Sequence, residues 1–178
     1  PPGLERGDLV RRWEELLAER GIPRVTAWRA WRAALGNGLM LEALHPVAGA
    51  RALPGEDLNP YSLVLRVEAE GQAVLLTADI DADAERRLLA ARLPLGAAVL
   101  KVAHHGSGSS TGRAFLEAVG PLFAVISVGI DNNFEHPDSA LLERLGEVPD
   151  LAVLRTDQAG TVEFVTDGAR LWVQTQKR

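Results

Sequence analysis

Three clusters of polar side chains in this sequence follow apolar runs, and their residue types suit metal-assisted or acid–base chemistry. The clusters are Asp79 after the run 73–77, His104 and His105 after 97–103, and 131–137 with His136 after 123–128. Carboxylate oxygens and imidazole nitrogens ligate divalent metals, and imidazole is also the most common general base. Open α/β sheets bind ligands beyond the carboxyl ends of their strands, so we expect these side chains to converge at one sheet edge.

Each cluster also has a purely structural interpretation. Asp79 or Asp81 could cap the helix predicted over 81–92, and that segment taken alone favours the cap. The stretch 131–137 taken alone favours a polar loop with Asn turns that leads into a helix. The occurrence of three clusters at three successive strand ends is what favours a shared site.

The adjacent histidines His104 and His105 carry the strongest of these signals. They precede a run of small residues, 106–111, whose backbone N–H groups could approach an anion. Neighbouring side chains on a strand face opposite ways, so we expect one imidazole inward and one outward unless the strand has already ended. The alternative is a surface loop in which Ser110 or Thr111 caps the next helix.

Other polar residues near predicted strand ends carry weaker signals. His45 precedes Pro46 and is interpreted as a turn or rim residue rather than a ligand. Asn59 leads into a strand and could reach a site at the sheet edge. The segment 155–157, Arg-Thr-Asp, is interpreted as a turn held by an Asx bond.

The composition describes a globular chain of about one domain. Its 178 residues are 47% hydrophobic and 24% charged, and the net charge of −5 gives no global basic footprint for nucleic acid. There is no cysteine, so any metal site must use the four histidines and the carboxylates. No apolar run reaches the ~20 residues of a membrane helix, and no signal peptide is visible.

The hydrophobic pattern predicts a layered α/β protein with a mixed sheet. Runs 73–77, 97–103 and 123–128 are continuously apolar, which favours strands buried on both faces. The predicted helices are 8–20, 81–92, 111–119 and 138–145. The predicted strands are 25–31, 39–44, 61–68, 73–77, 97–103, 123–128, 151–154, 161–166 and 170–174.

Four sequence blocks together resemble a known family. They are 74–80 with Asp79, 99–107 with His-His-Gly-Ser after a Leu-x-Lys-Val strand, 124–129 followed by His136-Pro137, and 155–157 followed by Gly160. Their order and spacing resemble the C-terminal metallo-β-lactamase-like domain of the ComEC family of DNA-internalisation competence proteins. The likeness runs from about Asn59 to the end of the chain.

Two departures qualify the likeness. The superfamily's His-x-His-x-Asp-His loop is absent from these residues, and the chain opens on the loop-like Pro1-Pro2-Gly3. We therefore expect the first metal-ligand loop and the leading strands to lie outside this sequence. The residues 1–178 would then form the C-terminal part of a single αββα sandwich domain, incomplete on its N-terminal side. Ala78 also stands where the family usually has Gly.

The resemblance implies roles for individual residues. Asp79 would bridge two metal ions, with His104 or His105 as a further ligand and with His105 and His136 beside the scissile group. The implied cofactor is a pair of divalent ions, Mn²⁺ or Zn²⁺. Residues that would bind the substrate are Lys101, Ser107, Asn59 and Arg113.

The implied reaction is metal-dependent phosphodiester hydrolysis of DNA during its uptake, although the fragment alone is expected to be inactive. The implied partners are DNA, as the single strand degraded or imported, and the rest of a polytopic membrane channel protein that holds this domain outside the cytoplasm. The alternative is a degenerate module of the same fold that docks DNA or a partner without catalysis. Hydrolysis of a small lactone, lactam or phosphoester is a third hypothesis, since fold does not fix substrate.

Overall fold

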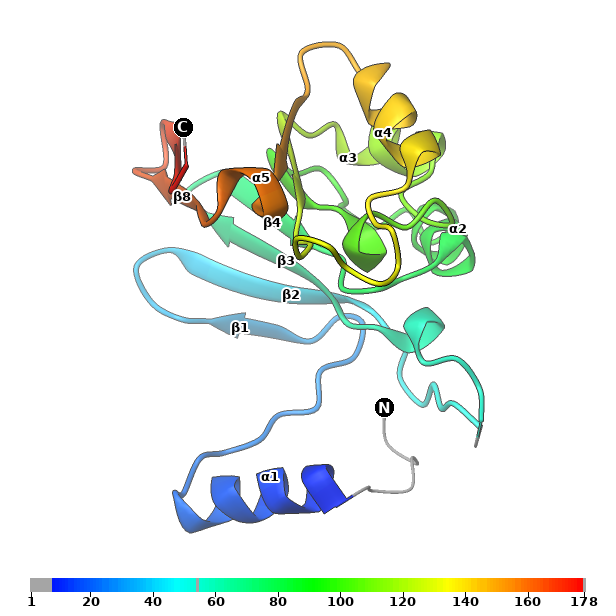
Figure 1. The fold of residues 1–178 in the computed structure, drawn as a ribbon. Coiled ribbons are helices and arrows are strands. Elements are labelled where there is room, and N and C mark those ends of the chain that lie inside the picture. The colour runs from blue at the N-terminus through cyan, green and yellow to red at the C-terminus, as the bar shows by residue number, and fades with distance from the viewer. Residues whose placement is uncertain (1–7, 54, 178) are drawn as a thin grey trace.

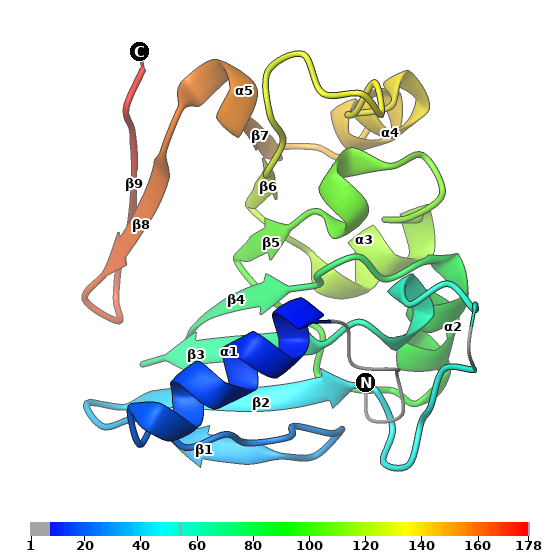
Figure 2. The ribbon, with the colours of Figure 1, turned by 60° about the horizontal axis from the view of Figure 1, so that its bottom comes forward.

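A computed structural model describes residues 8–53 and 55–177; the opening Pro1–Gly3 lies outside these ranges. The described residues form a mixed α/β structure built on a seven-stranded sheet whose spatial order follows the chain, β1 to β7 (Figures 1 and 2). Strands β1 to β4 pair antiparallel, and β4 to β7 pair parallel. The strands are β1 Arg32–Ala34, β2 Leu39–His45, β3 Val64–Ala69, β4 Gln72–Leu76, β5 Val99–Lys101, β6 Phe123–Ile126 and β7 Ala152–Arg155.

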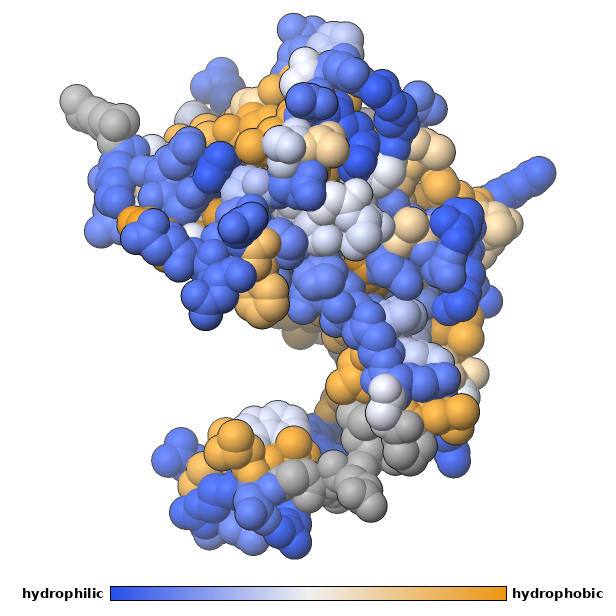
Figure 3. Space-filling view, turned by 45° about the vertical axis from the view of Figure 1, so that its right-hand side comes forward, coloured by the Kyte–Doolittle hydropathy of each residue, from blue (hydrophilic) through white to orange (hydrophobic). Residues whose placement is uncertain are grey.

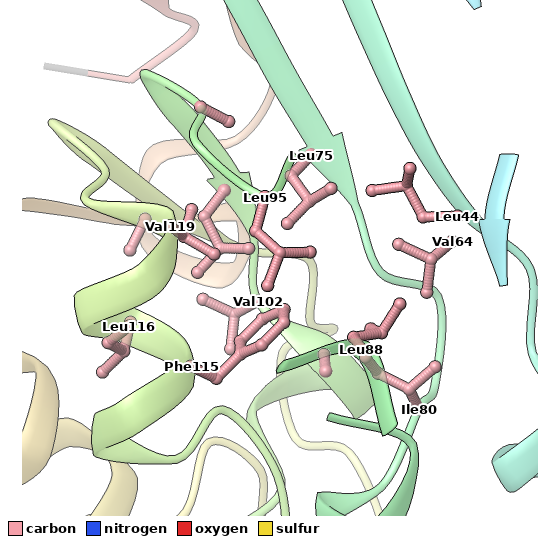
Figure 4. Close-up of a cluster of buried hydrophobic side chains, with 14 of the residues drawn as sticks. Leu44, Val64, Leu75, Ile80, Leu88, Leu95, Val102, Phe115, Leu116 and Val119 are labelled. Atoms are coloured by element: carbon pink, nitrogen blue, oxygen red, sulfur yellow. The ribbon is translucent and has the colours of Figure 1, made fainter. Parts of the chain in front are cut away.

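Three helices cover one face of the parallel half of the sheet. They are α2 Ala82–Ala90, α3 Arg113–Val119 and α4 Ser139–Gly146, and Figure 1 shows them on the same side. Leu75 from β4 lies with Leu88 and Phe115 from the helices in a core whose side chains are almost fully buried (Figure 4). Leu100 from β5 belongs to the same core. Burial of each such side chain stabilises the fold by roughly 1.5–3 kcal/mol. This packing holds the parallel strands, and therefore the loops at their carboxyl ends, in place.

The opposite face of the sheet is apolar and only partly covered. The register places Val74 beside Val99 and Leu76 beside Lys101 on this face, and Leu76 is 36% exposed. A separate hairpin, β8 Val162–Thr166 and β9 Leu171–Thr175, contacts it where the Phe164 ring meets that of Phe123. The expectation that run 73–77 is buried on both faces was therefore wrong. Within the described ranges, the helical layer covers only one side.

Helix α1, Asp8–Glu19, confirms the predicted amphipathic helix but stands apart from the sheet (Figures 1 and 3). None of its residues is buried, and Leu9, Val10 and Trp13 are exposed. Across the described part of the chain, no helix has the length and apolar character needed to cross a bilayer.

Two predicted strands differ from the structure. Residues 25–31 form no strand, because the amide of Trp31 donates to the carbonyl of Trp28 in a local turn before β1 begins at Arg32. The strand predicted over 97–103 is only β5, Val99–Lys101, because the chain turns into a short 3-10 helix, Ala103–Gly106. The remaining strands and the helices α2, α3 and α4 match their predicted positions to within a few residues.

Candidate functional site

A cleft of about 640 Å³ opens where β4, β5, β6 and β7 end. The structure brings Asp79, His104, His105 and His136 together in its lining, so the predicted convergence at one sheet edge is confirmed. Their chemical roles stay predictions. The other lining residues are Ser127, Val128, Gly129, Asn132, Phe134 and Thr156.

Asp79 is free to face this cleft because its neighbour caps the helix. The Asp81 carboxylate accepts the amide of Ala84 at 2.9 Å, which makes Asp81 the N-cap of α2. Ala78 has a φ of 46°, a left-handed conformation that turns the chain sharply between β4 and Asp79. The capping interpretation of this segment therefore applies to Asp81 and not to Asp79.

Both histidines of the adjacent pair reach the cleft because the strand has already ended. His104 (φ 49°, ψ 46°) and His105 (φ 54°, ψ 19°) both adopt left-handed conformations within the short 3-10 helix. Such conformations cost of order 1–3 kcal/mol per non-glycine residue and are held only where the surroundings enforce them. The amide of His104 is anchored by donating to the carbonyl of Ala78 at 3.0 Å.

His105 and Asp79 form the central pair of the site. The Nε2 atom of His105 lies 3.5 Å from Oδ1 of Asp79, and its Nδ1 lies 2.8 Å from the carbonyl oxygen of Ser127. A carbonyl oxygen can only accept, so Nδ1 carries the hydrogen. In the neutral ring, Nε2 then turns its lone pair toward the carboxylate. Two electron-rich atoms so placed are stabilised by a cation or a proton between them.

His104 has a different environment. Asn59 Nδ2 donates toward Nε2 of His104 across 3.4 Å, so Asn59 reaches the site as predicted. The His104 ring meets that of His136 edge-on at 5.8 Å. The pKa of His136 is lowered, first by burial and then by the neighbouring imidazoles. The sequence could not decide between the two adjacent histidines; the structure places His105 beside Asp79 and His104 beside Asn59.

Asp79 and His105 together could provide two of the ligands that one metal ion needs. Two ligands bound to a tetrahedral Zn²⁺ at ~2.1 Å lie roughly 3.4 Å apart, close to the 3.5 Å between His105 Nε2 and Asp79 Oδ1. In residues 8–53 and 55–177, no three His, Asp or Glu side chains are grouped closely enough to hold a metal ion. The pair Asp79 and His105 thus supplies two donors, and a two-metal site needs further ligands.

Three further residues were predicted to bind the substrate, and none of them lines the cleft: Lys101, Ser107 and Arg113. The Lys101 ammonium donates to the carbonyls of Ala78 (3.2 Å) and Val102 (3.3 Å), and burial lowers its pKa. Ser107 follows the histidine pair but is not part of the cleft lining. Arg113 also lies outside that lining, where it pairs with Glu147 on the exposed side of α3. Only Lys101 therefore lies beside the Asp79 turn.

Two residues that the sequence analysis missed hold the loop after the histidines. The Glu85 carboxylate, 3% exposed, accepts the amides of Thr111 and Gly112. Arg144 donates to the carbonyls of Ser110 (2.9 Å) and Thr111 (3.1 Å) from the other side. Burial raises the pKa of Glu85, and the two amides oppose that shift. No local sequence signal could reveal this clamp, because its partners are far apart in the chain.

Thr156 was also missed as a cleft residue. It begins the short helix α5, Thr156–Ala159, directly after β7. Its hydroxyl accepts the Val128 amide and donates to the Val128 carbonyl, both at 2.8 Å, which joins β7 to the wall of the cleft. The segment predicted as a turn is instead this helix, with Arg155 and Asp157 forming an ion pair beside it. Its position directly after a fourth strand could have identified Thr156 as a cleft residue from the sequence.

Comparison with known proteins finds relatives that include competence proteins. No family model matches the chain. It is 40% identical over 106 residues to ComE operon protein 3 of Bacillus subtilis, covering 60% of this chain and 14% of that protein. It is 40% identical over 109 residues to competence protein ComA of Neisseria gonorrhoeae, covering 61% and 16%. Recombination protein 2 of Haemophilus influenzae is 36% identical over 116 residues, covering 65% and 14%.

These relatives support the resemblance to competence proteins that the sequence blocks carried. The chain spans about a seventh of the length of each. Their similarity therefore concerns one part of much larger proteins.

Proposed function

We propose that this chain is the part of a DNA-uptake protein that hydrolyses phosphodiester bonds of DNA with the help of a bound divalent ion. The similarity to competence proteins supports the role in DNA uptake. The observation that carries the hydrolysis is the Asp79–His105 pair, whose donor atoms lie 3.5 Å apart in the lining of a cleft.

The tautomer of His105 is the reason this pair favours a metal. Metal-bound histidines commonly donate their second ring N–H to a carbonyl, which fixes the ring and frees the other nitrogen as a ligand. The bond from His105 Nδ1 to the Ser127 carbonyl is such a support. Mn²⁺ or Zn²⁺ held at Asp79 and His105 would supply a Lewis acid for phosphate oxygens and an acidified water.

Three side chains in or beside the cleft complete the proposed site: His136 accepts a proton, and Asn59 and Lys101 hold neighbouring groups in position. Burial and nearby imidazoles lower the pKa of His136, so its ring is neutral near pH 7 and an imidazole nitrogen can accept a proton. Asn59 holds Nε2 of His104, which keeps the His104 ring edge-on to His136. Lys101 secures the Ala78 carbonyl and thereby the turn that presents Asp79.

The proposal includes a metallo-β-lactamase-like sandwich. The open apolar face of the sheet supports it, because Leu76 and its neighbours would be buried by a second sheet. In this arrangement further protein supplies the ligands that the described residues lack. The complete protein would attach the domain to a membrane channel outside the cytoplasm, where it meets a single strand of DNA.

A docking module without catalysis is the alternative. The absence of a third clustered ligand within the described ranges and the net charge of −5 favour it. Such a module would bind a partner or DNA through the same cleft with no dependence on a metal. The two functions differ in one measurable property, which is cleavage.

Cleavage of a labelled oligonucleotide by the encoded full-length protein, with Mn²⁺ added, tests the proposal. Asp79→Asn removes a charged donor and should lower the rate by at least ~100-fold, since even indirect supports of metal ligands are worth 10–100-fold. Asp81→Asn is the matched control, because asparagine still caps α2 and the rate should stay close to normal. Equal rates for the two variants would overturn the proposal and favour the docking module.

A further inference from the structure

An aromatic side chain stands at the cleft with most of its surface in solvent. Phe134 lines the cleft, yet the residue is 79% exposed, and Ile130 on the same loop is 66% exposed. Exposing a phenylalanine ring forgoes much of the roughly 1.5–3 kcal/mol that burial would give. Neighbouring apolar side chains left exposed beside a cleft are a common mark of a ligand-binding surface.

The ring is held in place without being buried. Asn132 Oδ1 accepts the amides of Phe134 (3.2 Å) and His136 (3.0 Å), while Asn132 Nδ2 donates to the His136 carbonyl at 2.7 Å. On one side, the Phe134 ring stacks on His136 with centroids 5.9 Å apart and planes inclined by 24°. A ring fixed in this way loses little conformational entropy when a second planar group binds.

We propose that Phe134 stacks on an unpaired nucleobase and thereby selects single-stranded over duplex DNA at this cleft. The inference rests on the proposed function and names the form of its substrate. Every base offers a flat face, so the contact tolerates any sequence, but in a duplex both faces of an internal base are already occupied. A flipped-out or single-stranded base could reach the ring, and its phosphate could then approach His136 and His105.

The charges around the ring favour stacking over backbone attraction. The exposed acidic residues Asp131 and Glu135 flank Phe134 on the loop. The ammonium of Lys101, at the turn before Asp79, is half-buried and donates to two backbone carbonyls. We therefore expect weak salt dependence of binding, well below the slope of ~0.7 per neutralised phosphate that charge-driven binding to single strands shows.

Binding of fluorescent oligonucleotides to the full-length protein, with a chelator present to prevent cleavage, tests the inference. Phe134→Ala should weaken single-strand binding roughly 5- to 150-fold, the range that one base–aromatic stack provides. Phe134→Trp should retain or improve it. Ile130→Ala is the matched control, since it removes an exposed apolar side chain from the same loop and should leave affinity unchanged.

An oligonucleotide with abasic residues separates stacking from general binding. It should bind the unaltered protein as weakly as a normal strand binds Phe134→Ala, and the substitution should then make no further difference. Equal affinity of Phe134→Ala and the unaltered protein for a normal strand would overturn the inference. So would tighter binding of a blunt duplex than of its single strand, or no single-strand binding at all.

The outcome is distinguishable from failure of the proposed function. If no variant cleaves DNA but binding still depends on Phe134, hydrolysis is wrong and base stacking stands. If cleavage depends on Asp79 while Phe134→Ala leaves both affinity and KM unchanged, the hydrolysis stands and the stacking is wrong.

Discussion

Nε2 of His105 lies 3.5 Å from Oδ1 of Asp79 while Nδ1 of the same ring is bound to the Ser127 carbonyl. The backbone carbonyl of Ser127, directly after β6, therefore orients the His105 ring. Because Nδ1 carries the hydrogen, the neutral His105 ring faces the Asp79 carboxylate with a lone pair, and the proposed cation would lie between these two atoms.

The 178-residue chain should bind divalent metal weakly and at less than two equivalents, because the part of it that the structure describes supplies only two clustered donors. Elemental analysis for Mn and Zn after dialysis checks the stoichiometry. His105→Ala should abolish what binding there is, whereas His45→Ala should not change it, since His45 is buried against the Ser62 carbonyl. Two firmly retained equivalents per chain would contradict this account.

Glu85→Ala should lower the free energy of unfolding by about 2–5 kcal/mol, because it leaves the amides of Thr111 and Gly112 without their acceptor in a buried place. Asp83→Ala on the same helix removes an exposed ion pair with Arg86 and should cost only about 0.5 kcal/mol. Urea denaturation of both variants measures the difference. Similar losses would show that the clamp on the loop after the histidines is not a main source of stability.

The contribution of His45 to the free energy of unfolding should fall as the pH drops below about 6.5. Burial lowers the pKa of His45 in the folded protein, so the unfolded chain binds more protons in the window between the two pKa values. The contribution of His45 to stability is complete at pH values above its pKa in the unfolded chain. It is lost as the pH falls toward its lower pKa in the folded protein. His45→Gln should flatten the decline between about pH 7.5 and 5.5, measured by urea midpoints.

The lowered pKa of His136 contributes to the decline in both proteins, so the difference between them isolates His45. A decline of equal slope in the unaltered and His45→Gln chains would assign the effect to other groups.

Leu100→Ala should destabilise the isolated chain by about 2.5–5 kcal/mol, since Leu100 is fully buried under the helices. Leu76→Ala, on the open face of the neighbouring strand, should cost less than about 1 kcal/mol there, since it is already 36% exposed. In the full-length protein, a second sheet on this face would raise the cost of Leu76→Ala severalfold. Equal small costs in both contexts would argue against the sandwich.

Short-range sequence patterns, such as helix caps and apolar runs, predicted most of the helices and strands. Helix α2 follows from Asp81 as its cap and from its apolar spacing, and β4 to β7 follow from their apolar runs. Their alternation with helices already placed Asp79 and the histidines at one edge. The apolar runs alone did not predict the open face, because a continuously apolar strand has the same pattern whether its second cover lies in this sequence or elsewhere. The expectation of an incomplete sandwich came from the family resemblance.

The internal geometry of the site depends on features with no local signature. The amide of the left-handed His104 is held by the Ala78 carbonyl, and the loop after the two histidines is held by Glu85 and Arg144. Ala78, Glu85 and Arg144 are all distant in sequence from the residues they hold. That geometry assigns His105 to Asp79 and His104 to Asn59. Residue types and spacing identified His104 and His105 as candidates but could not show which of them lies beside Asp79.

The most direct test of the metal-dependent hydrolysis is the rate of Mn²⁺-dependent cleavage of a single-stranded oligonucleotide by the full-length protein carrying His105→Gln or His104→Gln. Loss of a metal ligand predicts that His105→Gln lowers the rate by at least ~100-fold and raises the Mn²⁺ concentration needed for half-maximal activity. His104→Gln should leave that Mn²⁺ requirement unchanged, because His104 bonds Asn59 and not the Asp79 pair. Cleavage by His105→Gln at the unaltered rate and with an unaltered Mn²⁺ requirement would contradict the account.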